Sequence, residues 1–293
     1  MYEVIDFGKR THYIDCPAKI GIFNLTENDV CLIDSGNSKD TAKKILKILN
    51  EKGWNLKTII NTHGHADHVG GNAYLQEKTG CEILCRGVDH ALTTHTLVNS
   101  SYLCGANSPK ICRGKFFYAE PADVKPLTNE NLPEGLEMLA ADGHSFSQTI
   151  IKTTDNAWFM ADAFAGKETI EKYGIVFVQN VEKYLATLEM LKTLEGEYFI
   201  PSHVASSCDI KELVGFNIEK TYQVLDDILC FTAEKITFEH LMKKLFDKYG
   251  LRLDFSQNML IGSTVKSYLT HLLDGGKIEA VFEENMQYWI AVK

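Results

Sequence analysis

The segment Thr62-His63-Gly64-His65-Ala66-Asp67-His68 constrains this chain more than any other, because it places three imidazoles and a carboxylate within six positions. Histidine is the commonest metal ligand in proteins, and a lone histidine is usually a surface residue or a hydrogen-bonded core residue. Three histidines beside an aspartate, in a segment that continues with Gly70 and Gly71, are hard to explain by packing. The segment therefore predicts a metal site.

The flanking residues place this site at the end of a strand. Residues 56–61 are short, β-branched and mostly apolar, which is typical of a buried strand. Residues 68–76 have the pattern of a helix start. The cluster thus lies at the carboxyl end of a strand, on the loop into a helix, where open α/β sheets generally place their functional sites.

The rest of the chain alternates strand and helix patterns and then becomes helical. We expect strands at 2–7, 12–15, 19–25, 30–34, 81–85, 136–140, 149–153, 157–161 and 197–200, and helices at 38–49, 88–97 and 181–194. After His203 the pattern predicts helices at 210–232, 237–249 and 259–273, and a hairpin of 278–282 with 288–292. This last order is the layout of a winged helix. We therefore expect an α/β (α+β) protein with a catalytic domain at 1–208 and a small helical, winged-helix-like domain at 209–293.

Residues 98–126 do not follow either periodic pattern. Their first part is rich in turn-forming residues, and residues 113–118 mix cationic and aromatic side chains. We expect an irregular excursion, which either covers the site as a lid or packs as an ordinary surface loop.

Composition and charge restrict the class of protein. The chain has 293 residues, 45% of them apolar, and a net charge of −9, which argues against nonspecific attraction to nucleic acid or to an anionic membrane. No apolar stretch of about 18 residues predicts a spanning helix, and the charged residues 1–6 do not resemble a signal peptide. The eight cysteines are then expected to be reduced thiols of a cytoplasmic protein. Cys81 and Cys85, near His90 and His95, have a metal-like spacing, but no second pair completes a structural zinc site.

Further metal-ligating residue types follow other predicted strands. His144 comes shortly after the strand at 136–140, Asp162 directly follows the strand at 157–161, and His203 follows the strand at 197–200. Asp34 is a further acid at a strand end, and we expect it to support a ligand rather than to bind a metal. Each residue alone is a weak signal, but together with the cluster they supply five histidines and two aspartates on loops after strands.

These residues resemble, in order, the five motifs of the metallo-β-lactamase superfamily, the αββα hydrolases that include glyoxalase II. The HxHxDH signature matches residues 63–68, and the remaining motifs match Asp34, His144, Asp162 and His203, so that the resemblance covers about 1–204. It implies that His63, His65 and His144 hold a first metal ion. It also implies that Asp67, His68 and His203 hold a second ion and that Asp162 bridges the two.

Two details refine the resemblance. The diiron flavoproteins of the superfamily carry Glu where this chain has His65, so the resemblance favours hydrolysis over oxygen reduction. The third motif usually reads His-Thr-Pro-Gly-Ser, whereas residues 144–148 here read His-Ser-Phe-Ser-Gln. The missing proline and glycine alter the loop that carries the ligand but leave the ligand itself. The fourth motif is usually Gly-Asp, and Ala161-Asp162 is a small change.

The implied activity is that of a hydrolase with two divalent metal ions. Imidazole and carboxylate ligands suit zinc, although iron and manganese remain open. We expect a metal-bridging hydroxide to attack a small ester or thioester, as in glyoxalase II. Asp67 and Asp34 are the catalytic candidates: Asp67 orients the hydroxide or shuttles a proton, and Asp34 supports a ligand histidine. Lys115, Tyr118 and Tyr173 are candidates for substrate contact.

Other functions stay open. Some winged-helix members of the superfamily act on RNA, so the main alternative is a metal-dependent nuclease. Residues 205–293, however, hold ten lysines and arginines against thirteen acids, and the run at 243–252 is sparse, so nucleic acid is not the partner we expect. We expect a small-molecule substrate, no membrane partner and a structural or dimerising C-terminal domain. A non-catalytic zinc scaffold and a single-iron persulfide dioxygenase are more distant alternatives.

Overall fold

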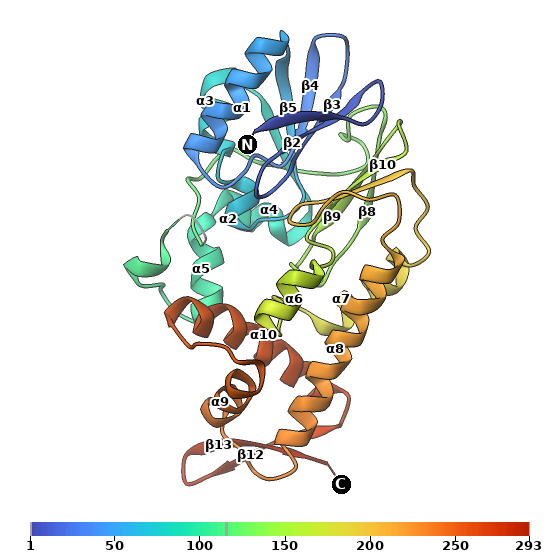
Figure 1. Ribbon diagram of the computed structural model, residues 1–293. Helices are drawn as coiled ribbons and strands as arrows, with labels where there is room; N and C mark the ends of the chain where they lie inside the picture. The colour runs from blue at the N-terminus through green and yellow to red at the C-terminus, as the bar shows by residue number, and fades with distance from the viewer. Residues whose placement is uncertain (1, 115–116, 293) are drawn as a thin grey trace. The chain divides into compact units, whose positions relative to one another are not determined.

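The computed structural model describes residues 2–114 and 117–292, and it divides into two compact units (Figure 1). Unit 1 comprises Met1–Ala163 and Leu194–Ile210, and unit 2 comprises Phe164–Thr193 and Lys211–Lys293. This division differs from the expected domains at 1–208 and 209–293, because residues 164–193 group with the C-terminal part. Their helices α6 (Lys167–Tyr173) and α7 (Val181–Leu191) pack on α8 (Lys211–Phe231).

Unit 1 is built on a seven-stranded mixed sheet whose strands follow one another in sequence order. Its strands are β1 (Glu3–Asp6), β2 (Thr11–Asp15), β3 (Ile20–Asn24), β4 (Asp29–Ile33), β5 (Asn55–Asn61), β6 (Glu82–Cys85) and β7 (Lys125–Pro126). The pairs from β1 to β4 are antiparallel and those from β4 to β7 are parallel. The loops after β4, β5 and β6 therefore meet at one edge of the sheet.

A second sheet packs against the first. It has the order β11 (Tyr198–Pro201), β10 (Ala157–Ala161), β9 (Thr149–Thr153) and β8 (Leu136–Ala140), with only β10 and β11 parallel. Alternate side chains of both sheets share one buried cluster, in which Phe23 and Ile60 of the first sheet join Phe159 of the second. This core fixes the two sheets face to face.

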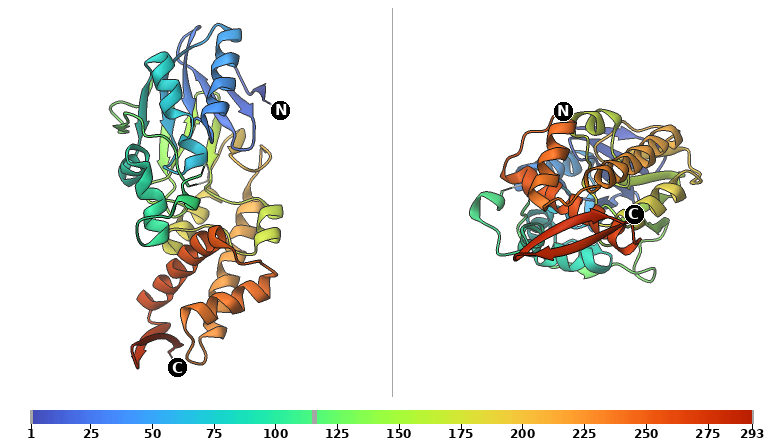
Figure 2. Two further views of the ribbon diagram at one scale, coloured as in Figure 1. Left: turned by 90° about the vertical axis from the view of Figure 1, so that its left-hand side faces the viewer. Right: turned by 90° about the horizontal axis from the view of Figure 1, so that it is seen from below.

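Helices cover the other face of the seven-stranded sheet. Helix α1 (Lys39–Lys52) begins where the Ser38 side chain accepts a hydrogen bond from the backbone N–H of Thr41, and it buries Ile45 and Leu49. These residues share a core with Leu75 of α3 (Asn72–Thr79) and with the outward-facing side chains of β2–β5. Figures 1 and 2 show α1 and α3 side by side on this face. The α/β class is as the sequence predicts, and the two facing sheets with an outer helical layer are as the resemblance implies.

The segment after β6 is more helical than expected. Helix α4 (Gly87–Thr94) ends near His95, and α5 (Thr96–Cys104) follows directly, so the irregular excursion expected at 98–126 is wrong for its first seven residues. The buried residues of α5 are Thr96, Asn99, Ser100 and Leu103. Because three of these are polar, the buried helical face does not show as an apolar pattern in the sequence. A short 3-10 turn, η1 (Lys110–Cys112), is the remaining regular element before β7 among the described residues.

Unit 2 follows the expected order of three helices and a hairpin after residue 210. Helices α8, α9 (Phe238–Tyr249) and α10 (Phe255–Asp274) precede β12 (Ile278–Glu283) and β13 (Met286–Ala291). The two hairpin residues Glu284 and Asn285 both have positive φ, as a tight two-residue turn requires. Figure 2 (right view) shows this hairpin from below.

Candidate metal centre

The histidine cluster leaves β5 at its carboxyl end and enters two short helices. His65 precedes α2 (Ala66–Val69), and Gly70 and Gly71 lead into α3. A Cβ on Gly71 would lie 2.2 Å from the Ser35 carbonyl oxygen, and one on Gly70 would lie 2.4 Å from the Asn37 carbonyl carbon. The two glycines are therefore required by the close approach of α2 and α3 to the loop after β4.

Three imidazoles form the first potential metal-binding group. His65 Nδ1 lies 2.9 Å from His63 Nε2 and 3.0 Å from His144 Nε2. Nitrogens bound tetrahedrally to zinc at about 2.0–2.1 Å are about 3.3 Å apart, so both distances to His65 Nδ1 are close to the spacing that one ion needs. All three ligand atoms lie within 4.8 Å of one another.

Two carboxylates and two imidazoles form the second group: Asp67, His68, Asp162 and His203. His203 Nε2 lies 3.2 Å from Asp67 Oδ2. Asp162 Oδ2 lies 3.4–3.6 Å from the Nε2 atoms of His203, His68 and His144. Because His144 belongs to the first group, Asp162 Oδ2 lies between the two groups.

Asp162 follows a residue with unusual backbone geometry. Ala161 has φ of 49°, in the left-handed region, and it ends β10 where the pairing with β11 shifts register. The superfamily usually has glycine here, which adopts this conformation without steric cost. The alanine therefore keeps the bend that presents Asp162 to the two groups.

Asp34 and Thr62 form hydrogen bonds with the Nδ1 atoms of two ligand imidazoles, on the side of each ring away from Nε2. Asp34 Oδ2 accepts hydrogen bonds of 2.8 Å from His68 Nδ1 and from the Thr62 hydroxyl, while Oδ1 accepts from the Thr62 backbone N–H. Since the Thr62 hydroxyl gives its proton to Asp34, its oxygen accepts from His63 Nδ1 at 3.1 Å. The Nε2 lone pairs of His63 and His68 then face the cluster. Asp34 thus lies behind a ligand ring, away from the reacting atoms.

Hydrogen bonds to the turn between β2 and β3 hold His203 in the loop after β11. His203 Nδ1 donates to the Pro17 carbonyl oxygen at 2.7 Å, and the Lys19 backbone N–H donates to Ser202 at 3.1 Å. The Lys19 side chain donates to the carbonyl of Val204. The turn between β2 and β3 therefore orients the His203 ring with Nε2 toward the carboxylates.

Burial keeps the first group neutral. Burial and the other imidazoles lower the pKa of His144 to about 4. Burial likewise lowers the pKa of His65 to about 4 and that of His63 well below its usual value. Neutral imidazoles at neutral pH have the lone pairs that a metal ion requires.

The second group has the opposite electrostatics. The Asp162 carboxylate, against the opposing effect of burial, raises the pKa of His203 to about 10. Burial would raise the pKa of Asp67, but His68 and His203 outweigh it and lower the pKa to about 2. The two carboxylates thus attract positive charge, which dications would supply.

Buried polar atoms without hydrogen-bond partners show independently that these residues suit a metal ion. His68 Nε2 and Asp162 Oδ1 are buried polar atoms without a hydrogen-bond partner. Such atoms cost free energy unless something satisfies them, and both belong to residues of the second group. Metal coordination would satisfy them, so these residues fit the group that the sequence implies.

The ligand residues differ in exposure to solvent, and the two most exposed side chains given below belong to the second group. The His63 and His68 side chains are inaccessible and His144 is 12% exposed, whereas His203 is 40% and Asp67 30% exposed. A substrate therefore has access to the centre from the side of Asp67 and His203.

The three expected substrate contacts have different outcomes. Lys115 lies outside the described residues. Tyr118 is half-buried in unit 1, and its backbone N–H donates to Gly114. Tyr173, 37% exposed, ends α6 in unit 2 beside Lys172. Their contact with substrate stays a prediction.

The alternative cysteine site does not form among the residues described. The Cys85 thiol accepts a hydrogen bond from Thr93, and His90 Nε2 donates to the Val124 carbonyl oxygen at 3.0 Å. The two groups above are the ones whose ligand atoms converge there.

Sequence reasoning missed Asp89 and Asn99. Asp89 is fully buried and accepts hydrogen bonds from Gly64, Ser145 and Ser147, and Asn99 donates to the Gly64 carbonyl oxygen. The signal for Asp89 was its place on the same α4 face as Leu92 and Thr93, since a carboxylate on a buried face needs partners.

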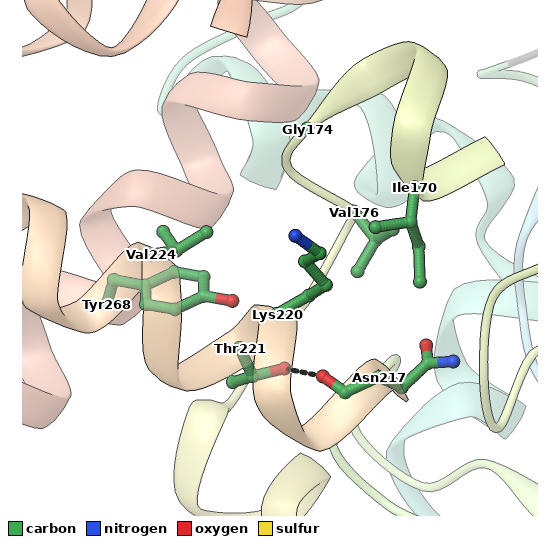
Figure 3. A pocket seen from close by; sticks show the side chains of 8 residues that line it. All are labelled: Ile170, Gly174, Val176, Asn217, Lys220, Thr221, Val224 and Tyr268. Atoms are coloured by element: carbon green, nitrogen blue, oxygen red, sulfur yellow. Dashed lines mark hydrogen bonds between the residues drawn. The ribbon is translucent and has the colours of Figure 1, made fainter. Parts of the chain in front are cut away.

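Unit 2 contains a small pocket that is separate from the metal-binding groups. Its volume is about 10 Å³, and Figure 3 shows Lys220 and Tyr268 among its lining residues. The Thr221 hydroxyl there donates to the Asn217 carbonyl oxygen at 2.8 Å. A cavity of this size holds one water molecule at most, so it is no substrate site.

The chain was compared with known families and curated proteins. A family model described as the metallo-beta-lactamase superfamily matches residues 15–203. The chain is 43% identical over 63 residues to a hydroxyacylglutathione hydrolase of Pelagibacter ubique, covering 22% of this chain and 25% of that protein. It is 39% identical over 67 residues to a protein of the same description from Methylococcus capsulatus, covering 20% and 26%. The chain thus spans about a quarter of the length of these relatives.

Two solved structures resemble this chain in fold over most of its length. A metallo-beta-lactamase family protein from Thermus thermophilus has a TM-score of 0.72 at 16% identity and covers 94% of both chains. A beta-lactamase domain protein from Burkholderia ambifaria has a TM-score of 0.76 at 12% identity, covering 99% of this chain and 94% of that one. Both likenesses concern the fold and reach into the C-terminal residues. None of the helices described has the length and apolar character needed to cross a membrane.

Proposed function

The chain belongs to the metallo-beta-lactamase superfamily, and from this premise we propose that it is a hydrolase that cleaves a small ester or thioester, as glyoxalase II does. The observation that carries the proposal is the pair of groups His63–His65–His144 and Asp67–His68–His203, with Asp162 Oδ2 between them. We propose zinc as the native metal, because neutral imidazoles and carboxylates are its usual ligands among nitrogen and oxygen donors.

The protein's own residues would divide the work as follows. When bound, two divalent ions supply Lewis acidity, which polarises a carbonyl and lowers the pKa of water. Asp67, the more exposed site carboxylate, orients the attacking water and accepts its proton. Asp34 keeps the His68 ring in place through Nδ1. Water adds to the carbonyl carbon, the carbon–sulfur bond breaks, and the thiolate takes up a proton.

Relatives described as hydroxyacylglutathione hydrolases support a thioester substrate, although their matches cover only about a quarter of their length. The exposure of Asp67 and His203 also supports a substrate that enters beside these two residues. Small acyl thioesters fit this arrangement because only the acyl carbonyl needs to reach the centre.

The nuclease alternative has weaker support. A groove of about 480 Å³ in unit 2 is lined by Lys235, Lys243 and Lys244 among other residues. Lys235 pairs with Glu283 and Lys243 with Asp247. The lysines that line the groove are thus largely neutralised, whereas a phosphate-binding surface needs free cations. We therefore keep RNA cleavage as an outcome of the test.

The test is metal analysis of the purified protein followed by a substrate panel. We expect about two zinc ions per chain and release of thiol from a hydroxyacyl thioester of glutathione, with little hydrolysis of lactones, phosphodiesters or single-stranded RNA. His65→Ala should lose one ion and most turnover. Cleavage of RNA without thioester turnover would replace the proposal with the nuclease, and near-wild-type metal content and turnover in the variant would refute the two-metal assignment.

A further inference from the structure

Two helices after β6 hold the two peptide groups that flank Gly64, the residue between two ligand histidines. Asp89 Oδ1 of α4 accepts a hydrogen bond of 2.8 Å from the Gly64 N–H, and Asn99 Nδ2 of α5 donates to the Gly64 carbonyl oxygen at 3.0 Å. Both side chains are almost fully buried. The backbone between His63 and His65 is therefore fixed on both of its polar sides.

The other oxygen of Asp89 holds the loop that carries His144. Asp89 Oδ2 accepts a hydrogen bond of 3.0 Å from the Ser145 hydroxyl and one of 2.6 Å from the Ser147 N–H. A single carboxylate thus connects the two loops that present His63, His65 and His144. These loops are far apart in sequence, so their relative placement depends on such a connection.

Neighbouring contacts strengthen the connection. The Ser147 hydroxyl accepts a hydrogen bond of 3.0 Å from the Val88 N–H, and the Arg86 side chain pairs with Asp142. A Cβ on Gly87 would lie 2.5 Å from Ser147 Oγ. The start of α4 therefore packs directly against the His144 loop.

The sequence of this loop now has a physical explanation. Phe146 and Ser147 stand where the usual third motif has proline and glycine, and Ser145 stands where it has threonine. Both serines bond to the start of α4. A rigid turn sequence would need less external support. In this chain, hydrogen bonds to a buried carboxylate supply the support.

Burial of the Asp89 carboxylate has an electrostatic cost. Burial raises the pKa of Asp89, and its three hydrogen-bond donors only partly offset that effect. Two of those donors are backbone N–H groups, which cannot accept a proton in return, so the bonds require the carboxylate. An uncharged side chain would fill the same space at a lower desolvation cost.

We propose that Asp89, assisted by Asn99, is a positioning residue that sets the spacing of His63, His65 and His144 and thereby the affinity of this group for its metal ion. It touches neither the metal nor the substrate. The proposal rests on the two-metal centre of the proposed function. Residues that orient metal ligands from behind typically change metal affinity by about 10–100-fold when they are removed.

The test compares Asp89→Asn with a matched control, Asp155→Asn. Asp155 also lies in unit 1 and also accepts two backbone N–H bonds and one hydroxyl bond, from Lys9, Arg10 and Thr11. It lies in the turn between β9 and β10, at the opposite ends of these strands from His144 and Asp162. Thermal unfolding of the metal-free proteins measures the structural cost of each variant.

Metal affinity is read by competition with a chromophoric chelator and by the visible spectrum of the Co²⁺-substituted protein. We expect Asp89→Asn to bind one of the two ions about 10–100-fold more weakly and to alter the Co²⁺ spectrum. Asp155→Asn should destabilise the fold and keep both affinities. Asn99→Leu, which keeps the carboxylate, should weaken the same ion by a smaller factor and serves if Asp89→Asn does not fold.

The possible failures are distinguishable. If the wild type binds two ions but cleaves no thioester, the proposed function fails and the role of Asp89 is still decided by the affinities. If the wild type binds two ions and Asp89→Asn and Asn99→Leu keep both at wild-type affinity, the positioning role is refuted. If Asp155→Asn weakens metal binding as much as Asp89→Asn does, the effect is general destabilisation and the role is also refuted. A wild type that binds no metal refutes both proposals.

Discussion

A single aspartate supports the His68 ring by fixing its tautomer. Asp34 has φ of 65°, a conformation that asparagine tolerates better than most residues. Its Oδ2 accepts hydrogen bonds from both His68 Nδ1 and the Thr62 hydroxyl. An amide in this place would present an N–H group to His68 Nδ1 and favour the tautomer whose Nε2 carries the proton, so that the ring loses its ligand lone pair.

We therefore expect Asp34→Asn to weaken metal binding by about 10–100-fold while the protein stays folded. Chelator competition measures the change in affinity. The control is Asp6→Asn, because Asp6 accepts a hydrogen bond from His12 Nδ1 at 2.6 Å in the same unit but outside the metal groups. Equal metal affinity in Asp34→Asn and the wild type would contradict the role of Asp34.

Short elements around the centre depend on close backbone contact. Gly70 has an ordinary helical φ of −63°, so only space restricts it. A Cβ there would lie 2.4 Å from the carbonyl carbon of Asn37 and 2.7 Å from the nitrogen of Ser38, and backbone atoms cannot move aside as flexible side chains do. We expect Gly70→Ala to lower the free energy of unfolding by about 1–3 kcal/mol, measured by denaturant unfolding of the metal-free protein.

The control for Gly70→Ala is Gly215→Ala, which we expect to raise the free energy of unfolding. Gly215 lies inside α8, and a Cβ there meets no atom within 4 Å. Alanine is the better helix former by about 1 kcal/mol, so Gly215→Ala should stabilise the protein. A Gly70→Ala variant as stable as the wild type would show that the loop after β4 moves freely away from α2.

The helices differ in how well the sequence predicts them. Helices α1 and α9 have apolar faces at helical spacing and capping residues at Ser38 and Thr237, and their bounds were predicted to within a few residues. Helix α5 buries Asn99 and Ser100 instead, and Asn99 bonds to Gly64 while Ser100 bonds to Ser108. In sequence these residues resemble a turn, because their partners are distant and only the folded chain brings them together.

The residues of the metal centre also divide into those with a local sequence signal and those whose partners are distant in sequence. The cluster at 63–68 is local in sequence, so its chemistry is visible there. His144, Asp162 and His203 were found as metal-ligating residue types after predicted strands, and the resemblance to a known family then divided them between two ions. Asp89 forms its hydrogen bonds with Gly64, Ser145 and Ser147. None of these partners lies near it in sequence, and so its place behind the centre could not be predicted.

At the scale of the whole molecule, the metal centre belongs to one unit. All seven proposed ligands, residues 63–203, lie in unit 1, which includes Leu194–Ile210 through β11. The folded form of unit 1 should bind metal ions far more tightly than the unfolded chain. Binding then stabilises this unit by a free energy that grows with the ratio of free metal to the dissociation constant, about 4 kcal/mol at a thousandfold excess.

Removal of the metal should therefore affect amide hydrogen exchange unevenly. We expect exchange after chelation to accelerate by up to about a thousandfold in the loops after β5, β10 and β11 and in the His144 loop. Helices α9 and α10, which lie in unit 2 and carry none of the ligands, should exchange as before. Return of zinc should restore protection, whereas equal acceleration in both units would mean that they unfold together, and no change in the four loops would mean that the proposed ligands bind no metal.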